Sequence, residues 1–341
     1  MALTINTNIS SLIAQKSMKN STDALNRSIE RMTTGFKINH AADNAAGYSI
    51  AEIWDTQLST LDVAASNAAI GADLLTTAEE NYDLLTDHLQ RIRDLTEQAA
   101  NGTYGSASLR AIQSEVAARL QEIYRISSNA EFNGIKLMAY TEGGDNSDIG
   151  ITADGLNIQV GLYADEHSRI KLNIDLFSNA SISGLFKAMK DDTSESGEKL
   201  SDILKSANGG TDIIDSLNDL DSIQAFAAAC SGLVYDSATK TFKLQTLENM
   251  TAREMLGFLD SAIDELSERV TRIGAVQNRL TSAMSSIDVQ SQNITSSLST
   301  LRDTDVAEES SNFVQAQILQ QASATLLSTA NQLPSIALNL I

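Results

Sequence analysis

Cysteine, histidine and proline are nearly absent from this chain of 341 residues. Cys230 is the only cysteine, which excludes an intrachain disulfide and a cysteine-based metal cluster. The three histidines, His40, His88 and His167, fall in different predicted elements, and none has a second histidine or cysteine at the spacing of a metal site. Pro334 is the only proline, and because it lacks a backbone N–H we expect it to kink or interrupt a helix there.

The sequence also lacks the common signatures of enzymes. It contains no HExxH, no GxxxxGK[ST] phosphate loop, no GxGxxG after a strand and no GxSxG turn. These absences argue against metalloproteases, NTPases, dinucleotide-binding enzymes and α/β-hydrolases. We therefore expect no catalytic, cofactor-binding or metal-binding residues and no enzymatic activity.

Basic side chains are scarce. The chain has 24 Lys and Arg against 44 Asp and Glu, a formal net charge of −20. Nucleic acids and anionic membranes attract proteins with basic surfaces, so we expect neither as a partner. Residues 141–248 hold 18 acidic and 8 basic side chains, which is half of the net charge, and we expect this middle region to face water.

Long hydrophobic runs are missing as well. A membrane-spanning helix needs roughly 20 mainly apolar residues in a row, and glutamines such as Gln315, Gln317 and Gln320 interrupt the most apolar part of the chain. The first residues show no basic region followed by a continuous apolar stretch, so we expect no cleaved secretory signal.

Both ends of the chain are uncharged and have apolar side chains at helical spacing. Residues 1–15 and 310–341 contain no Asp, Glu, Lys, Arg or His. Such helices can be buried on every side without desolvating a charge. We predict that the two ends pair with each other and with neighbouring copies, and that these residues pack in the core of the assembly: Ile5, Ile9, Leu12, Leu319, Leu326, Leu333 and Leu340.

Long helices with a seven-residue repeat are predicted on both sides of the middle region. Aromatic residues make up only 5% of the chain, which favours slender helix packing over a thick core. One repeat begins at Leu61 within a helix expected over 47–100, and a third helix should end near Ser128. The most regular repeat predicts a coiled-coil seam made by Leu259, Leu266, Ile273, Leu280, Ile287, Ile294 and Leu301.

The middle region changes period. Asn133-Gly134 predicts a hairpin turn, and alternation in 156–160 and 169–177 predicts short strands. Residues 185–247 combine polar runs with short apolar clusters, typical of a small mixed module. The expected fold class is therefore mainly α, with long coiled-coil helices from both termini, a small β-hairpin region and a small mixed outer module.

Several strings of this sequence, in order, resemble the bacterial flagellins. They are MALTINTNISSL at the start, SIERMTTGFKINHAADNAAGYSIA (28–51), LQRIRDLTEQAANGTYG (89–105), IQSEVAARLQEI (112–123), FNGIKL (132–137), RIGAVQNRL (272–280), LRDTDVAEES (301–310), QILQQAS (317–323) and ANQLP (330–334). One such string would be a weak signal, but nine in family order are a strong one.

The resemblance implies a structural subunit that assembles helically into the bacterial flagellar filament for motility, outside the cell, after export by the flagellar type III apparatus. It implies as partners further copies of the chain, an export chaperone, the filament cap and hook-filament junction proteins. A hook-filament junction protein and a flagellin with an enzymatic insert remain alternatives. The implied division is an inner coiled coil and connecting segment (1–42), two long helices with hairpins (43–184), a reduced outer module (185–248), a long helix (249–300) and the second half of the inner coiled coil (301–341).

The resemblance also implies a possible receptor contact. Gln90, Arg91, Arg93 and Leu95 match a Q-R-x-R-x-L pattern through which the family is recognised by Toll-like receptor 5, and Glu115 matches the acidic partner position. The same residues could instead pack one subunit against another.

Overall fold

The chain forms long helices with a few short strands, as expected from the sequence. The computed structural model describes residues 8–139, 151, 155–189, 199–208, 220–236, 240–244 and 250–338. It divides into two compact units: Met1–Asp62 with Asp288–Ile341, and Val63–Ile287. The mainly α fold class is thus confirmed.

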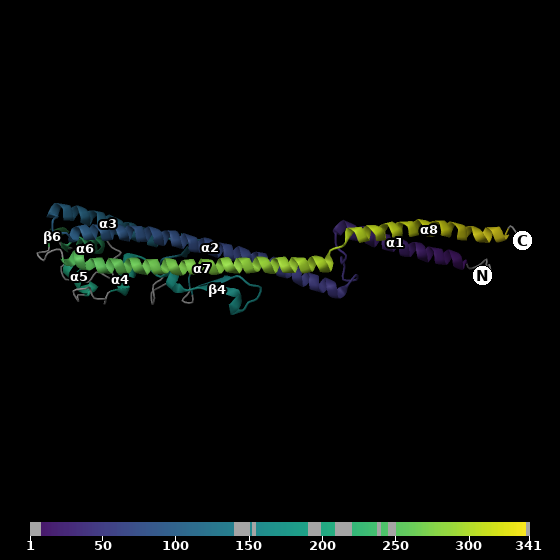
Figure 1. Cartoon of the computed structure of the whole chain (residues 1–341), viewed down its shortest axis with the longest axis horizontal. Helices are drawn as coiled ribbons and strands as arrows, with labels where there is room; N and C mark the ends of the chain where they lie inside the picture. Colours follow the sequence, from purple (N-terminus) through teal and green to yellow (C-terminus); the bar gives the residue numbers. More distant parts are fainter. Residues whose placement is uncertain are drawn as a thin grey trace. The chain divides into compact units, whose positions relative to one another are not determined.

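The first unit pairs the two ends of the chain. Helix α1 (Ile9–Thr34) lies antiparallel to α8 (Val306–Leu338), and the two run side by side in Figure 1. Helix α1 ends at Gly35, whose φ of +77° is left-handed and suits glycine. The start of α8 is fixed by Asp305, whose carboxylate accepts hydrogen bonds from the backbone N–H groups of Ala307 (2.8 Å) and Glu308 (3.3 Å).

The second unit is built around one whole helix and the parts of two longer helices that fall within Val63–Ile287, and these share one apolar core. Helices α2 (Ala45–Ala100), α3 (Ser106–Asn129) and α7 (Met250–Arg302) lie side by side in Figure 1. The expected repeat along α2 is confirmed, because Ala68, Leu75, Tyr82 and Leu89 are all fully buried. The phenol of Tyr82 donates a 2.8 Å hydrogen bond to the carbonyl of Leu176 and so ties the strand region to α2.

Among the described residues, three short antiparallel hairpins accompany these helices. The predicted turn at Asn133-Gly134 joins β1 (Glu131–Phe132) to β2 (Ile135–Lys136), with φ of +50° and +81° at its two central residues. Strand β3 (Leu156–Gln159) pairs with β4 (Arg169–Leu172), preceded by the 3₁₀ turn η1 (Glu166–Ser168), and β5 (Leu233–Asp236) pairs with β6 (Thr241–Leu244).

The predicted strand over 169–177 is too long. After β4 the chain makes a 3₁₀ turn, η2 (Ile174–Phe177), in which the adjacent residues Leu176 and Phe177 are both buried. Neighbouring side chains of a strand point to opposite faces. A helical turn allows both to enter the same core.

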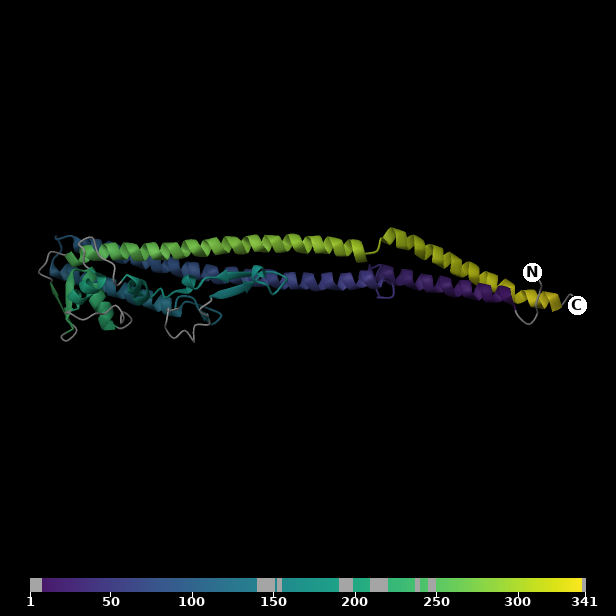
Figure 2. The same cartoon turned by 90° about the horizontal axis from the view of Figure 1, so that it is seen from below.

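The mixed region after η2 contains α4 (Ile182–Ala188), α5 (Leu200–Ala207) and α6 (Leu220–Cys230). Helix α6 packs against α3, and its buried Phe226 belongs to the same core as the long helices. In Figure 2 the short elements gather along the long helices of this unit. The five-part division expected for the assembled filament stays a prediction.

Candidate assembly surface

A ladder of polar side chains joins α1 to α8. The residue numbers of the five pairs sum to between 338 and 342, so all five are consistent with a single antiparallel register. Such hydrogen bonds specify register because a shifted pairing would leave their partners unsatisfied. The pairs are Asn8 Nδ2 to Ala330 O (2.7 Å), Ser11 Oγ to Asn331 Oδ1 (2.8 Å), Ser17 Oγ with Ser323 Oγ (3.2 Å), Gln320 Nε2 to Thr22 Oγ1 (3.1 Å) and Arg31 Nη1 with Glu309 Oε2 (3.6 Å).

Pro334 is accommodated at one end of this ladder. Helix α8 continues through it to Leu338, so the expected interruption is wrong, while the alternative expectation of a kink stays a prediction. The missing N–H of Pro334 leaves the Ala330 carbonyl, four residues earlier, without its intrahelical donor. The Asn8 amide supplies that donor, while its Oδ1 accepts from the Ser11 N–H (3.0 Å) and caps α1.

The interface between α1 and α8 buries small side chains and leaves large apolar ones outside. Ser11, Ala14, Ser21 and Ser28 of α1 are buried, as are Ala316, Ser323 and Ala330 of α8. The large apolar side chains of the two helices are exposed instead. Soluble proteins rarely expose so many large apolar side chains together. Those at least 40% exposed are Ile9, Leu12, Ile13, Ile29, Met32, Val306, Val314, Ile318, Leu319 and Leu326.

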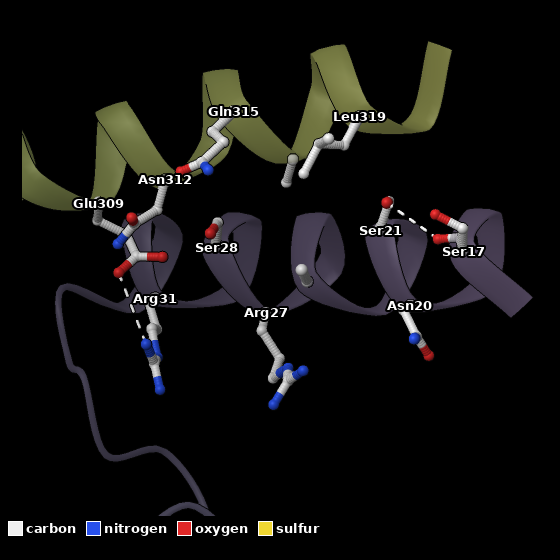
Figure 3. Close-up of a pocket in the computed structure, with 12 residues that line it drawn as sticks. Ser17, Asn20, Ser21, Arg27, Ser28, Arg31, Glu309, Asn312, Gln315 and Leu319 are labelled. Carbon is white, nitrogen blue, oxygen red and sulfur yellow. Dashed lines mark hydrogen bonds and ion pairs between the residues drawn. The ribbon is translucent and has the colours of Figure 1, made fainter. Parts of the chain in front are cut away.

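Small side chains also leave a groove between the two helices. A groove of about 490 Å³ runs over Ser21, Ser28 and Ala316. Figure 3 shows Gln315 and Asn312 of α8 facing this groove, with the Arg31 to Glu309 ion pair closing one end. A second hollow of about 370 Å³ lies between Ile13 and Leu326. The pair therefore presents both ridges and grooves.

The segments that link these helices to α2 and α7 are paired with each other. The Lys37 N–H donates to the Arg302 carbonyl (2.7 Å), and the Thr304 N–H donates to the Gly35 carbonyl (2.8 Å). The Arg302 guanidinium lies 4.5 Å from the centre of the Phe36 ring and forms a 2.9 Å ion pair with Asp55.

The structure places the predicted core-packing residues as follows. Ile5 and Leu340 lie outside the described residues, and Leu333 lies in α8. Ile9, Leu12, Leu319 and Leu326 are 57%, 56%, 49% and 63% exposed, so none of these four is used to bury the α1–α8 interface. Their packing in an assembly stays a prediction.

The predicted seam of α7 is buried over most of its length. Leu259, Leu266, Ile273 and Leu280 are fully buried and Ile287 is 4% exposed, whereas Ile294 and Leu301 are half-buried. Where Gln277 interrupts the apolar pattern, its amide donates a 2.8 Å hydrogen bond to Glu79 of α2.

The residues of the predicted receptor contact differ in accessibility. Gln90 is exposed, and Arg91 forms a 3.0 Å ion pair with Glu115. Arg93 pairs with Glu97 (3.2 Å) and with Asp260, whose hydrogen bond raises the pKa of the guanidinium. Leu95 is 2% exposed and belongs to the helix core.

Sequence reasoning missed the polar ladder. Its serines and asparagines have no periodic hydrophobic signal, and their partners lie about 300 residues away along the chain. Two residues in the sequence could have indicated it. Asn8, near the start of the chain, is a residue type that caps helices, and Pro334, near its end, leaves a helix carbonyl without a donor.

The described residues contain no group of three or more His, Cys, Asp or Glu side chains that could hold a metal ion. Among the described helices, none combines the length and hydropathy that crossing a bilayer requires. The exposed apolar surface of the α1–α8 pair is accordingly the strongest candidate for a functional surface in these parts of the chain.

Comparisons with known proteins agree with an assembling subunit. The N-terminal helical region of bacterial flagellin matches residues 5–142, and its C-terminal helical region matches residues 256–341. The chain is 32% identical to Polar flagellin F of Vibrio parahaemolyticus and 31% identical to Flagellin D of Vibrio anguillarum, with 100% of both sequences covered in each case. A solved flagellar hook-associated protein from Vibrio parahaemolyticus has a TM-score of 0.52 at 14% identity, covering 76% of this chain and 100% of that one, a likeness of fold alone.

Proposed function

Because this chain belongs to the bacterial flagellin family, we propose that its α1–α8 pair drives its assembly into the flagellar filament. The chain is a structural subunit of that extracellular filament. The observation that carries the proposal is the inverted distribution of side chains, with small residues buried between α1 and α8 and large apolar ones exposed.

Burial against further copies would stabilise the assembly. Fully burying an exposed leucine or isoleucine side chain contributes about 1.5–3 kcal/mol. Beyond Glu309 the described part of α8 has no charged side chain, so burial there desolvates no charge. The groove and the hollow beside these residues offer complementary space for side chains of another copy.

The test compares the full chain with a truncation and with point variants. Removal of residues 310–341 should abolish filaments while α2, α3 and α7 stay folded, measured by sedimentation, electron microscopy and circular dichroism. Leu326→Ser changes an exposed side chain of α8 and should raise the critical concentration for assembly. Tyr163→Ser is the matched control, because Tyr163 is 65% exposed outside the α1–α8 pair. Filaments from the truncated chain, or equal effects of the two point variants, would refute the proposal.

We infer the specific export and assembly partners of the chain from its family membership. Export through the flagellar type III apparatus without a cleaved signal, a chaperone that covers the C-terminal helix, a filament cap and hook-filament junction proteins all fit a subunit with exposed apolar ends. A chaperone would cover the exposed Ile318 and Leu319 before assembly. Native mass spectrometry of the monomer with the chaperone, comparing the full chain with the truncation, tests that contact.

Recognition by Toll-like receptor 5 is supported by the surface positions of Gln90, Arg91 and Glu115. The buried Leu95 would act by holding α2 in place. A receptor reporter-cell assay with monomeric protein should show a reduced response to Arg91→Ala. An unchanged response would remove these residues from the contact.

A further inference from the structure

We propose that the outward face of α2 from Val63 to Asp94 docks onto the face of α7 around Arg279 in a second copy of the chain. The inference rests on the proposed assembly of copies and names two surfaces within it that lie outside the α1–α8 pair.

The outward face of α2 carries a row of exposed apolar side chains. Val63, Ile70 and Leu84 are 58%, 53% and 49% exposed. Their separations of 7 and 14 residues place them on one side of the helix. The other side of α2 is already used, since Leu75, Tyr82 and their neighbours in the repeat are fully buried.

A row of carboxylates runs beside these apolar side chains. Asp73, Glu80, Asp87 and Asp94 follow each other at seven-residue spacing and are all exposed. Within the described parts of the chain, none of them forms an ion pair. The entire segment 38–90 contains no Lys or Arg. This face therefore presents apolar ridges flanked by uncompensated negative charge.

The acidic row decides which surface of a second copy can cover it. Two α2 faces placed against each other would oppose like charges, which disfavours a symmetric contact. The partner surface must be a different face of the chain. A contact between two different faces can repeat from copy to copy, and it extends into a helical array when the rotation that relates the copies does not close into a ring.

The segment 269–287 of α7 has the complementary character. It contains three arginines and no Asp or Glu. Arg269 and Arg272 already form ion pairs with Glu265 and Glu268 of the same helix, so Arg279 is the arginine that this face offers to a partner. Arg279 is exposed and has no ion pair among the described residues. The exposed neighbours of Arg279 on this face, Ala275 and Ser282, are small and leave room for protruding Ile and Leu side chains.

The acidic row of α2 and Arg279 of α7 do not pair with each other within a single chain. Helix α7 meets α2 through its buried side, where Ile273 and Leu280 are fully buried and Gln277 bonds to Glu79. The acidic row and Arg279 remain at the surface. Both faces are thus free to meet another copy.

Disulfide formation between copies tests the contact directly. Asp73→Cys, Glu80→Cys and Asp87→Cys chains are each assembled in a mixture with Arg279→Cys chains and oxidised with copper phenanthroline. The native Cys230 is fully buried, so it should not contribute disulfide-linked dimers in the folded chain. We expect covalent dimers in at least one mixture and none in filaments made of a single variant.

Variants with reversed charge provide a second, independent test of the contact between α2 and α7. Glu80→Arg and Arg279→Glu should each raise the critical concentration several-fold, and an equal mixture of the two should assemble better than either alone. Glu166→Arg, an exposed reversal on η1, is the control and should behave as the unchanged chain.

The outcomes separate the two proposals. Filaments without dimers in any mixture, or dimers from an α2 variant alone, would overturn the docking of α2 on α7. Reversals that assemble like the control would overturn it as well. Failure of the unmodified chain to form filaments would overturn the proposed function and this inference with it.

Discussion

Asn8 and Pro334 depend on each other although 326 positions separate them in the sequence. Asn8 caps α1 with its side-chain oxygen and satisfies the Ala330 carbonyl with its amide nitrogen. The second contact is needed because Pro334 cannot donate to that carbonyl. One side chain thus completes the hydrogen bonding of both helix ends.

Asn8→Ala should destabilise the α1–α8 pair by about 1–2 kcal/mol, since it removes a cap and leaves a carbonyl unsatisfied. Pro334→Ala restores an N–H at that position, so the cost of Asn8→Ala should be smaller in the double variant. Hydrogen exchange of α1 and thermal depolymerisation of filaments measure the coupling. Additive effects of the two substitutions would contradict it.

Cys230 should be inert towards thiol reagents in the folded protein. Burial raises the pKa of its thiol from 9.0 to about 12, partly offset by a hydrogen bond with Thr96. At pH 8 the thiolate, which is the reactive form, is then absent from the native state. Labelling should require opening of the unit and should accelerate in urea together with unfolding. Ser66→Cys, at an exposed position on α2, is the control and should react at once.

The raised pKa of the Cys230 thiol also makes the free energy of unfolding depend on pH. Above pH 9 the unfolded state releases the thiol proton, while the folded state retains it until about pH 12. The unfolded state then binds fewer protons, so the free energy of unfolding falls as the pH rises. Cys230→Ala should remove this contribution between pH 9 and 11, as measured by urea denaturation.

At the scale of elements, two helical glycines have opposite surroundings. A Cβ at Gly71 of α2 would lie 2.3 Å from Ile158 Cδ1 of β3, so this glycine permits the hairpin to approach the helix. A Cβ at Gly274 of α7 would meet nothing within 4 Å. Gly274 therefore only weakens its helix, by up to about 1 kcal/mol relative to alanine.

Gly71→Ala should destabilise the second unit by about 1–3 kcal/mol through overpacking. Gly274→Ala should leave it unchanged or stabilise it by up to about 1 kcal/mol. Thermal unfolding of the two variants side by side is the measurement. If Gly274 also lets α7 adjust between filament forms, the curvature of Gly274→Ala filaments should respond less to pH and salt. Equal destabilisation by the two substitutions would contradict the assignment of their surroundings.

The elements that the sequence predicted well are those with a sustained period. The repeat along α2, the Asn133-Gly134 turn and the end of α2 at Ala100 depend on local patterns, and all three agree with the structure. The turn of η2 was missed because the adjacent residues Leu176 and Phe177 both pack into the same core. That packing depends on the tertiary structure and leaves no local pattern in the sequence. The α1–α8 ladder was missed because residues distant in sequence decide it.

The candidate surface was predictable only in part. Absence of charge predicted that both ends would be buried, but not which side of each helix would face its partner. Apolar periodicity favoured an interface of Ile and Leu, as at Leu12 and Leu326, whereas serine and alanine fill it. Hydrogen bonds between short polar side chains decided that choice.

At the scale of the whole molecule, the net charge of −20 opposes assembly. Copies brought together repel each other over roughly 30 Å at 0.01 M salt, but over only about 8 Å at 0.15 M. The critical concentration for filament formation should therefore fall as sodium chloride rises over this range, measured by sedimentation. A rise would show that attraction between charged faces outweighs the net repulsion.

The pairing of α1 with α8 also makes assembly depend on the completeness of the chain. Asn8 and Ala330 meet across 322 positions, so the first helix has no partner until the last has been synthesised. A prematurely terminated chain would contain α1 but no ladder to hold it. Such a product could not form the paired ends, and if the pair drives assembly as proposed, incomplete molecules would be excluded from the polymer.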